Sequence, residues 1–185
     1  MTKRAFDLAL ALLGLPVAAP VVLACMAAIR LSSPGPAIFR QTRIGRHERP
    51  FTCYKLRTMY VGTGDRPTHQ AAASAVTPLG RRLRRLKLDE LPQLWNVLRG
   101  DMSFVGPRPC LPSQTELIAA RRQYGLDAIR PGITGVSQVA GIDMSATEKL
   151  AASDAAYLAD MSIAADLRLI VTTALGAGRV DHVRR

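Results

Sequence analysis

The sequence is poor in cysteine and in aromatic residues, and both shortages exclude classes of protein. Its three cysteines, Cys25, Cys53 and Cys110, form no Cys-x-x-Cys pair. This scatter excludes a disulfide-stapled fold and a cysteine zinc site, and it suggests reduced thiols in the cytosol. Aromatic residues make up only 5% of the chain and do not alternate with its basic residues. We therefore expect no nucleic-acid partner.

Acidic residues are also scarce relative to basic ones. Fourteen aspartates and glutamates face 25 lysines and arginines, giving a formal net charge of +11 and a pI near 10.6. So large an excess implies an anionic partner, which can be a nucleic acid, a lipid surface or a phosphorylated substrate. The 185 residues suit one domain with a modest core, and their hydrophobic content of 48% is unevenly distributed.

The longest apolar run lies near the N-terminus, where residues 8–29 carry no charge. A straight helix of this length would measure about 33 Å, enough to cross a membrane. However, Pro16 and Pro20 interrupt it, and cations flank both ends, with Lys3 and Arg4 before it and Arg30 after it. The positive-inside rule places both flanks in the cytoplasm, which favours a re-entrant hairpin over a single span. We therefore predict a membrane anchor over residues 1–32 and a cytosolic domain over residues 33–185.

The cytosolic part begins after the helix-breaking residues 32–36 and is predicted to be α+β and predominantly helical. Residues 37–39 and 51–54 are typical of short strands around a turn, and Lys55 and Arg57 follow on one strand face. Such cations are most often solvated, but they can also contact phosphate. Residues 79–88 predict a basic amphipathic helix suited to anionic headgroups. Serines 113, 145 and 162 are predicted helix caps.

Two adjacent carboxylates, Asp89 and Glu90, stand directly before residues with helical apolar spacing that end at Gly100. Asp89 is a candidate N-cap, with Pro92 in the first turn. Arg108 follows in the stiff sequence Gly-Pro-Arg-Pro of residues 106–109. An ionised aspartate at such a position can be a simple cap or a nucleophile toward phosphate, and the spacing alone leaves both open.

The combination of Leu-Asp-Glu-Leu-Pro-Gln (88–93) with Gly-Pro-Arg-Pro resembles the signature of the bacterial sugar transferase family, the small monotopic phosphoglycosyl transferases. The similarity runs from Lys3 to about Asp166. It implies a re-entrant membrane hairpin broken at a Ser-Pro pair, which here reads Ala19-Pro20. It also implies attachment to the cytoplasmic face of the bacterial inner membrane, in the first membrane step of a glycan pathway.

The resemblance also implies a reaction. Such enzymes move a phosphosugar from a nucleoside diphosphate sugar, here expected to be a UDP-sugar, to polyprenol phosphate and release UMP. Asp89 would form a covalent phosphosugar intermediate, and Glu90 would hold Mg²⁺ together with Asp89 or help to deprotonate the acceptor. Lys55, Arg57 and Arg108 would offset phosphate charge. Arg130, in the family-like segment Arg-Pro-Gly-Ile-Thr-Gly, either pairs with a structural carboxylate or contacts phosphate.

One segment departs from the family pattern, and two other functions compete. Many members continue with Asn-Gly-Arg where this chain has Ala140-Gly141-Ile142, so its sugar or nucleotide selectivity differs or another arginine substitutes. Glycoside hydrolysis needs carboxyls roughly 5–9 Å apart across a sugar, which does not suit neighbouring residues. A non-enzymatic, membrane-tethered adaptor that binds anionic lipid would explain the charge but not the acidic pair. A hydrophobic membrane surface is compatible with a homodimer, although no segment marks an interface.

Overall fold

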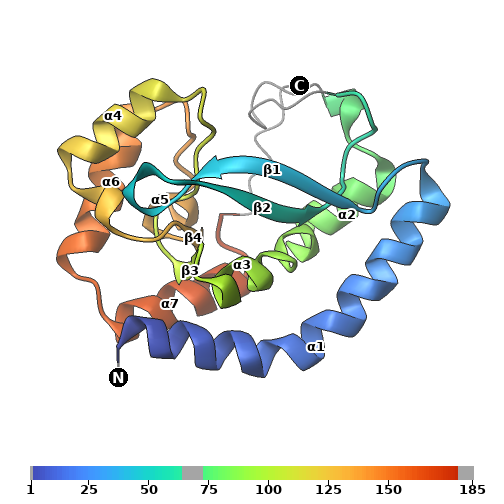
Figure 1. Cartoon of the computed structure of the whole chain (residues 1–185), viewed down its shortest axis with the longest axis horizontal. Coiled ribbons are helices and arrows are strands. Elements are labelled where there is room, and N and C mark those ends of the chain that lie inside the picture. Colours follow the sequence, from blue (N-terminus) through green and yellow to red (C-terminus); the bar gives the residue numbers. More distant parts are fainter. Residues whose placement is uncertain (1, 64–72, 179–185) are drawn as a thin grey trace.

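The computed structural model describes residues 2–63 and 73–178, so parts of the predicted cytosolic domain lie outside the described residues. The structure is a mostly helical α+β fold (Figure 1). Its elements are α1 (Lys3–Ser32), β1 (Ile38–Ile44), η1 (Arg46–Glu48), β2 (Pro50–Leu56), η3 (Ala73–Ala75), α2 (Pro78–Arg85), η4 (Leu88–Glu90), α3 (Gln93–Arg99), β3 (Ser103–Val105), α4 (Thr115–Gln123), η5 (Leu126–Ala128), β4 (Gly132–Thr134), α5 (Val136–Val139), α6 (Thr147–Ala159) and α7 (Ile163–Ala174).

Helix α1 is a single helix of 30 residues that contains both Pro16 and Pro20. Figure 1 shows that it runs along the lower edge of the molecule and then bends upward around one side. It is long and apolar enough to cross a membrane, and only 11% of its most apolar window is buried. The expected division into two helices at Ala19-Pro20 is therefore not observed, and re-entrant insertion stays a prediction.

The first turns of α1 are fastened to the rest of the fold by charged side chains. Lys3 forms an ion pair with Asp166 on α7. Arg4 donates from Nη1 to the carbonyl of Val97 (2.6 Å) and from Nη2 to that of Leu98 (3.0 Å), at the C-terminal end of α3. These cations, which the sequence suggested only as a membrane flank, therefore also join the anchor to two other helices.

A buried carboxylate completes this attachment. Asp7 is 1% exposed, and its Oδ1 accepts hydrogen bonds from Ser103 Oγ (3.0 Å) and from the amide of Phe104 (3.2 Å). Because Ser103 and Phe104 belong to β3, the anchor supports the strand that leads to Arg108. At its other end, Ile29 of α1 lies in an apolar cluster with Leu83 of α2. Both ends of α1 thus pack against one globular unit.

Two small sheets position the functional loops. Strands β1 and β2 form the predicted hairpin, longer than expected, with Ile38 opposite Leu56 and Ile44 opposite Pro50. Strands β3 and β4 are parallel, so they bring together the Gly-Pro-Arg-Pro loop and the Arg-Pro-Gly-Ile-Thr-Gly segment. The core between α1, β2 and α3 contains the buried residues Ala11, Cys53, Val97 and Met102.

The prediction that Asp89 caps a helix is wrong. Asp89 lies in the 3₁₀ turn η4, which follows Lys87 in the left-handed conformation (φ 56°), and α3 begins only at Gln93. Pro92 has no N–H to donate to the carbonyl of Leu88, so the regular helical hydrogen bonds start after it. The predicted end at Gly100 is confirmed, because this residue adopts a left-handed conformation with φ 89°.

Of the other predicted caps, only one is observed. Ser162 accepts a hydrogen bond from the amide of Ala165 at the start of α7. Helices α4 and α6 begin instead after Gln114 and Ala146, with no side-chain cap, so the assignments to Ser113 and Ser145 are wrong.

Candidate active site

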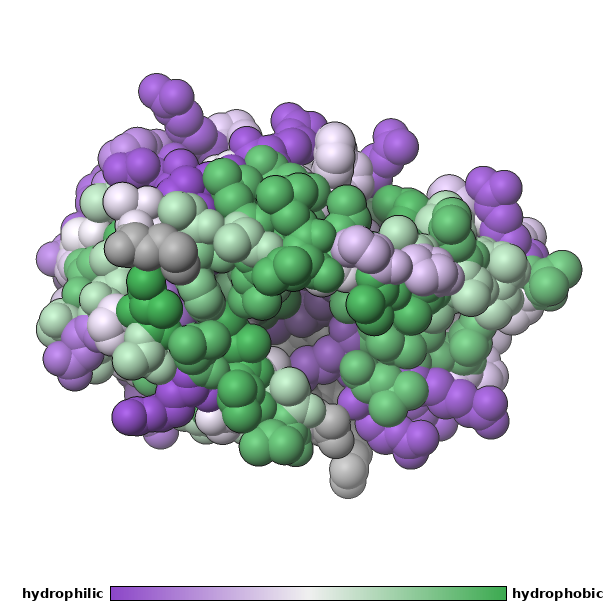
Figure 2. Space-filling model, turned by 90° about the horizontal axis from the view of Figure 1, so that it is seen from below, coloured by the Kyte–Doolittle hydropathy of each residue, from purple (hydrophilic) through white to green (hydrophobic). Residues whose placement is uncertain are grey.

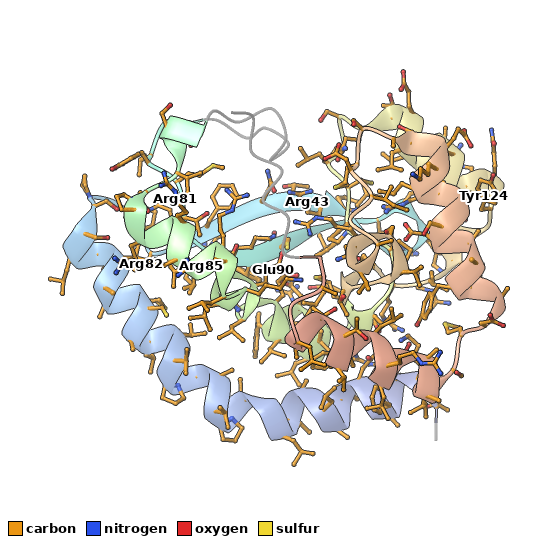
Figure 3. All side chains as sticks on the ribbon, turned by 180° about the vertical axis from the view of Figure 1, so that it is seen from behind. Arg43, Arg81, Arg82, Arg85, Glu90 and Tyr124 are labelled. Atoms are coloured by element: carbon orange, nitrogen blue, oxygen red, sulfur yellow. The ribbon has the colours of Figure 1, made fainter. Side chains whose placement is uncertain are left out.

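Lys55, Glu90 and Arg108 come together from three separate segments. Lys55 lies on β2, Glu90 in η4 and Arg108 in the loop after β3. Oε1 of Glu90 lies 2.8 Å from Nζ of Lys55 and 3.7 Å from Nη2 of Arg108. Figure 3 shows Glu90 near the middle of the molecule, between α2 and α7, and Arg43 of β1 above it in this view. The three residues line one pocket, together with Arg43, Cys53, Gln93, Pro109, Gly132, Ile133 and Gln138.

The two adjacent carboxylates have opposite pKa shifts. Burial, reinforced by the charge of Glu90, raises the pKa of Asp89 above 3.8, and the cations Lys55, Arg84 and Arg108 only partly offset this rise. Burial also disfavours the charged form of Glu90, but Lys55 and Arg108 outweigh it and lower the pKa of this carboxyl to about 2. Glu90 is therefore the fixed anion of the pair, and Asp89 is the more basic carboxylate. Such a division is typical of paired catalytic carboxyls with different roles.

Two predicted substrate ligands have other partners. Arg57 is 6% exposed, and its guanidinium donates to the carbonyls of Ser33 and Pro34 and to Oγ of Ser33, just after α1. Arg130 donates from Nε to the carbonyl of Gly100 (2.8 Å). Burial and the nearby charge of Arg4 lower the pKa of Arg130. The structure thus joins Lys55 and Arg108 to Glu90, whereas contact of Arg57 or Arg130 with substrate stays a prediction.

Comparison with known proteins identifies the family of the chain. The family described as "Bacterial sugar transferase" matches residues 1–178. The chain belongs to the bacterial sugar transferase family. The resemblance seen in its sequence is thereby confirmed.

Its relatives in this family include proteins named as sugar-phosphate transferases and the uncharacterized sugar transferase EpsL. The UDP-glucose:undecaprenyl-phosphate glucose-1-phosphate transferase of Caulobacter vibrioides is 41% identical, over 94% of this chain and 68% of its own length. The sugar transferase EpsL of Bacillus subtilis is 39% identical, over 92% of this chain and 84% of its own length. The Escherichia coli transferase with the same name as the Caulobacter protein is 40% identical, but the chain spans only 39% of its length.

The structure adds a residue that the sequence did not single out in this member of the bacterial sugar transferase family. Arg84 of α2 is half-buried, and its positive charge partly offsets the rise in the pKa of Asp89 that burial causes. The sequence assigned every arginine of α2 to the lipid surface. No signal in the sequence distinguished it from Arg85, which is nearer to the acidic pair along the chain.

The acidic pair also bears on the expected Mg²⁺. Within residues 2–63 and 73–178, no group of three or more His, Cys, Asp or Glu side chains could hold a metal ion. Mg²⁺ nevertheless binds through one or two carboxylates together with substrate phosphates and water. Asp89 and Glu90 supply two carboxylates of the kind that such a site requires, and binding of Mg²⁺ by this pair stays a prediction.

Proposed function

We propose that this protein transfers a phosphosugar from a UDP-sugar to polyprenol phosphate, forming a polyprenyl-diphosphate sugar and UMP. The observation that carries the proposal is the buried carboxylate of Asp89 next to Glu90, which forms ion pairs with Lys55 and Arg108. Burial raises the pKa of Asp89, and the two cations lower the pKa of Glu90. Two relatives are named as UDP-glucose:undecaprenyl-phosphate glucose-1-phosphate transferases, which supports the same classes of donor and acceptor for this protein.

In the first step, an Oδ of Asp89 attacks the phosphorus attached to the sugar. The bond from this phosphorus to the bridging oxygen breaks, UMP leaves, and the phosphosugar remains on Asp89. The raised pKa of Asp89 favours this role, because a more basic carboxylate is a better nucleophile. Lys55 and Arg108 offset the negative charge of the diphosphate.

In the second step, a phosphate oxygen of polyprenol phosphate attacks the same phosphorus. The bond to Asp89 breaks, which restores the free carboxylate and forms the new diphosphate. Glu90 would either hold Mg²⁺ or help to deprotonate the acceptor, and its lowered pKa favours the first role. Mg²⁺, when bound by the pair, would supply further neutralisation of phosphate charge.

The anchor explains how a soluble donor meets a lipid acceptor. Both ends of α1 pack against the same globular unit, which suits a re-entrant helix whose two flanks stay on the cytoplasmic face of the inner membrane. Figure 2 shows that the face seen from below is largely hydrophobic, with a hydrophilic hollow near its centre. Exposed apolar side chains from the helices along this edge include Leu12, Leu13, Val17, Trp95, Leu167 and Val171.

The proposal is tested by incubating the detergent-purified protein with Mg²⁺ and a panel of UDP-sugars, without acceptor, and measuring its intact mass. A phosphosugar adduct on Asp89 is the expected result, and it would identify the sugar. Polyprenol phosphate added next should discharge the adduct and make UMP release catalytic. Absence of both the adduct and UMP release, with every donor, would contradict the proposal.

One alternative function has an observation in its favour. Arg81, Arg82 and Arg85 are exposed on α2 (Figure 3), as in a membrane-tethered adaptor that binds anionic lipid. Such an adaptor would bind anionic vesicles without any turnover of nucleotide sugar.

The membrane topology of α1 has a test of its own. In the re-entrant arrangement, a tag at either flank of residues 8–29 should be accessible only from the cytoplasm.

A further inference from the structure

The loop that carries Arg108 is held through four consecutive backbone carbonyls. Pro107 and Pro109 have no N–H group, so this loop cannot satisfy its carbonyls by local turns alone. The donors come from β4, α4 and β1: Gly132 N to Pro107 O (2.9 Å), Arg121 Nη1 to Arg108 O (2.7 Å), Arg43 Nη1 to Pro109 O (2.9 Å) and Ile44 N to Cys110 O (2.9 Å).

Arg121 is the donor that holds Arg108 itself, and a buried chain of polar groups holds Arg121. Its Nη2 donates to Oδ2 of Asp154 on α6 (3.1 Å). Oδ1 of the same carboxylate accepts from Oγ of Ser137 on α5 (2.6 Å). Arg121 is 8% exposed, Asp154 is 2% exposed and Ser137 is fully buried. A helix of the C-terminal half thus reaches into the active-site loop through one guanidinium.

A gain in stability does not by itself account for the buried ion pair of Arg121 and Asp154. A buried ion pair costs desolvation energy, and apolar residues of similar volume often replace one with no loss of stability. Moreover, Nε of Arg121 is buried with no acceptor among the described residues. What the pair does provide is a planar, charged fork that binds the Asp154 carboxylate and the Arg108 carbonyl at the same time.

We propose that Arg121 is a positioning residue: with Asp154 and Ser137 it fixes the backbone of Arg108 and thereby aims the Arg108 guanidinium at the phosphate of the donor. The inference rests on the proposed function in one respect, the contact of Arg108 with phosphate. Arg121 does not line the pocket of Lys55, Glu90 and Arg108, so its effect on the reaction passes through Arg108.

A double-mutant cycle tests this dependence. Wild type, Arg108→Ala, Arg121→Gln and the double variant are compared for kcat and KM of UMP release, for binding of inorganic pyrophosphate by calorimetry, and for Tm. Arg121→Gln should lower kcat by about a hundredfold, as expected for a misplaced catalytic group. In the Arg108→Ala background it should change kcat by less than about twofold, because the group it positions is absent. Equal losses in both backgrounds would overturn the proposal.

The neighbouring Arg122 provides a matched control. It lies on the same helix and has the same charge, but its ion pair with Glu48 is at the surface. Arg122→Gln should leave kcat within about twofold of wild type. Because Arg121→Gln leaves Asp154 unpaired and endangers folding, Arg121→Lys is the second variant. It keeps the cation but lacks the fork, so kcat should fall while Tm is retained; a lower Tm with wild-type kcat would contradict the positioning role.

Pyrophosphate binding separates this inference from the proposed function. If the wild type binds pyrophosphate but transfers no phosphosugar, the proposed function fails. The same double-mutant cycle, measured as the Kd for pyrophosphate, then still tests the role of Arg121. If Arg108→Ala changes neither binding nor turnover, Arg108 does not contact phosphate and the inference fails.

Discussion

Gly106, directly after β3, and Gly132 of β4 lie so close together that a Cβ on Gly132 would be 2.1 Å from the amide nitrogen of Gly106. A Cβ on Gly106 would in turn lie 2.4 Å from the carbonyl oxygen of Arg130. The amide of Gly106 donates to Thr134 O, and the amide of Gly132 donates to Pro107 O, each at 2.9 Å. Two motifs far apart in the sequence therefore form one rigid support for Arg108.

Gly132→Ala should separate these strands and displace Arg108. We expect a loss of at least about a hundredfold in kcat, together with a lower Tm, because backbone atoms cannot move aside as a flexible side chain can. Gly14→Ala is the control, since a Cβ at Gly14 meets no atom within 4 Å. Both variants are compared with wild type by UMP release and thermal unfolding. A wild-type kcat in Gly132→Ala would refute the claim that the two glycines form a rigid support for Arg108.

Asp89→Asn should abolish turnover and the phosphosugar adduct, with a loss of at least about a thousandfold, because an amide is no nucleophile toward phosphorus. Membrane association should be unchanged, since Asp89 caps no helix and belongs to η4 rather than to α1. Asp160→Asn, at an exposed position after α6, is the control for loss of one carboxylate. Near-normal turnover in Asp89→Asn would rule out this residue as the nucleophile.

Glu90 should make stability depend on pH in the acid range. Its pKa falls from 4.5 to about 2 on folding, so the stability that Glu90 contributes is complete above pH 4.5 and is lost as the pH falls toward 2. Asp89, whose pKa is raised, acts with the opposite sign. As the pH is lowered from 6 to 2, the Tm of Glu90→Gln should therefore fall less steeply than the Tm of wild type. Parallel curves would show that Lys55 and Arg108 do not hold Glu90 ionised.

Asp7→Ala should loosen the anchor from the fold. The change leaves Ser103 Oγ and the amide of Phe104 without their acceptor, a cost of about 1–3 kcal/mol for buried polar groups. Because these atoms belong to β3, kcat should fall as well. Asp7→Asn retains an acceptor and should recover most of both losses. An unchanged Tm in Asp7→Ala would contradict the attachment described here.

Local patterns predicted the β1–β2 hairpin, the helix end at Gly100 and the family signature, because each depends on neighbouring residues. Long-range contacts could not be predicted in this way. The sequence offered Asp89 as a cap, but Pro92 delays α3 and leaves Asp89 in a separate turn. Arg57 looked equivalent to Lys55, yet it donates to the carbonyls that follow α1. Asp7 gave no signal at all, because its partners lie about a hundred residues away.

The packing of Ala11 bears on how this protein can be handled. Ala11 is fully buried within the apolar anchor, against Cys53, Val97 and Met102 of the catalytic part. Deleting residues 1–32 to obtain a water-soluble enzyme would therefore open the interior rather than trim a tether. For this chain, α1 is part of the folded core, and we expect a detergent that pulls α1 away to inactivate the enzyme before it unfolds the rest.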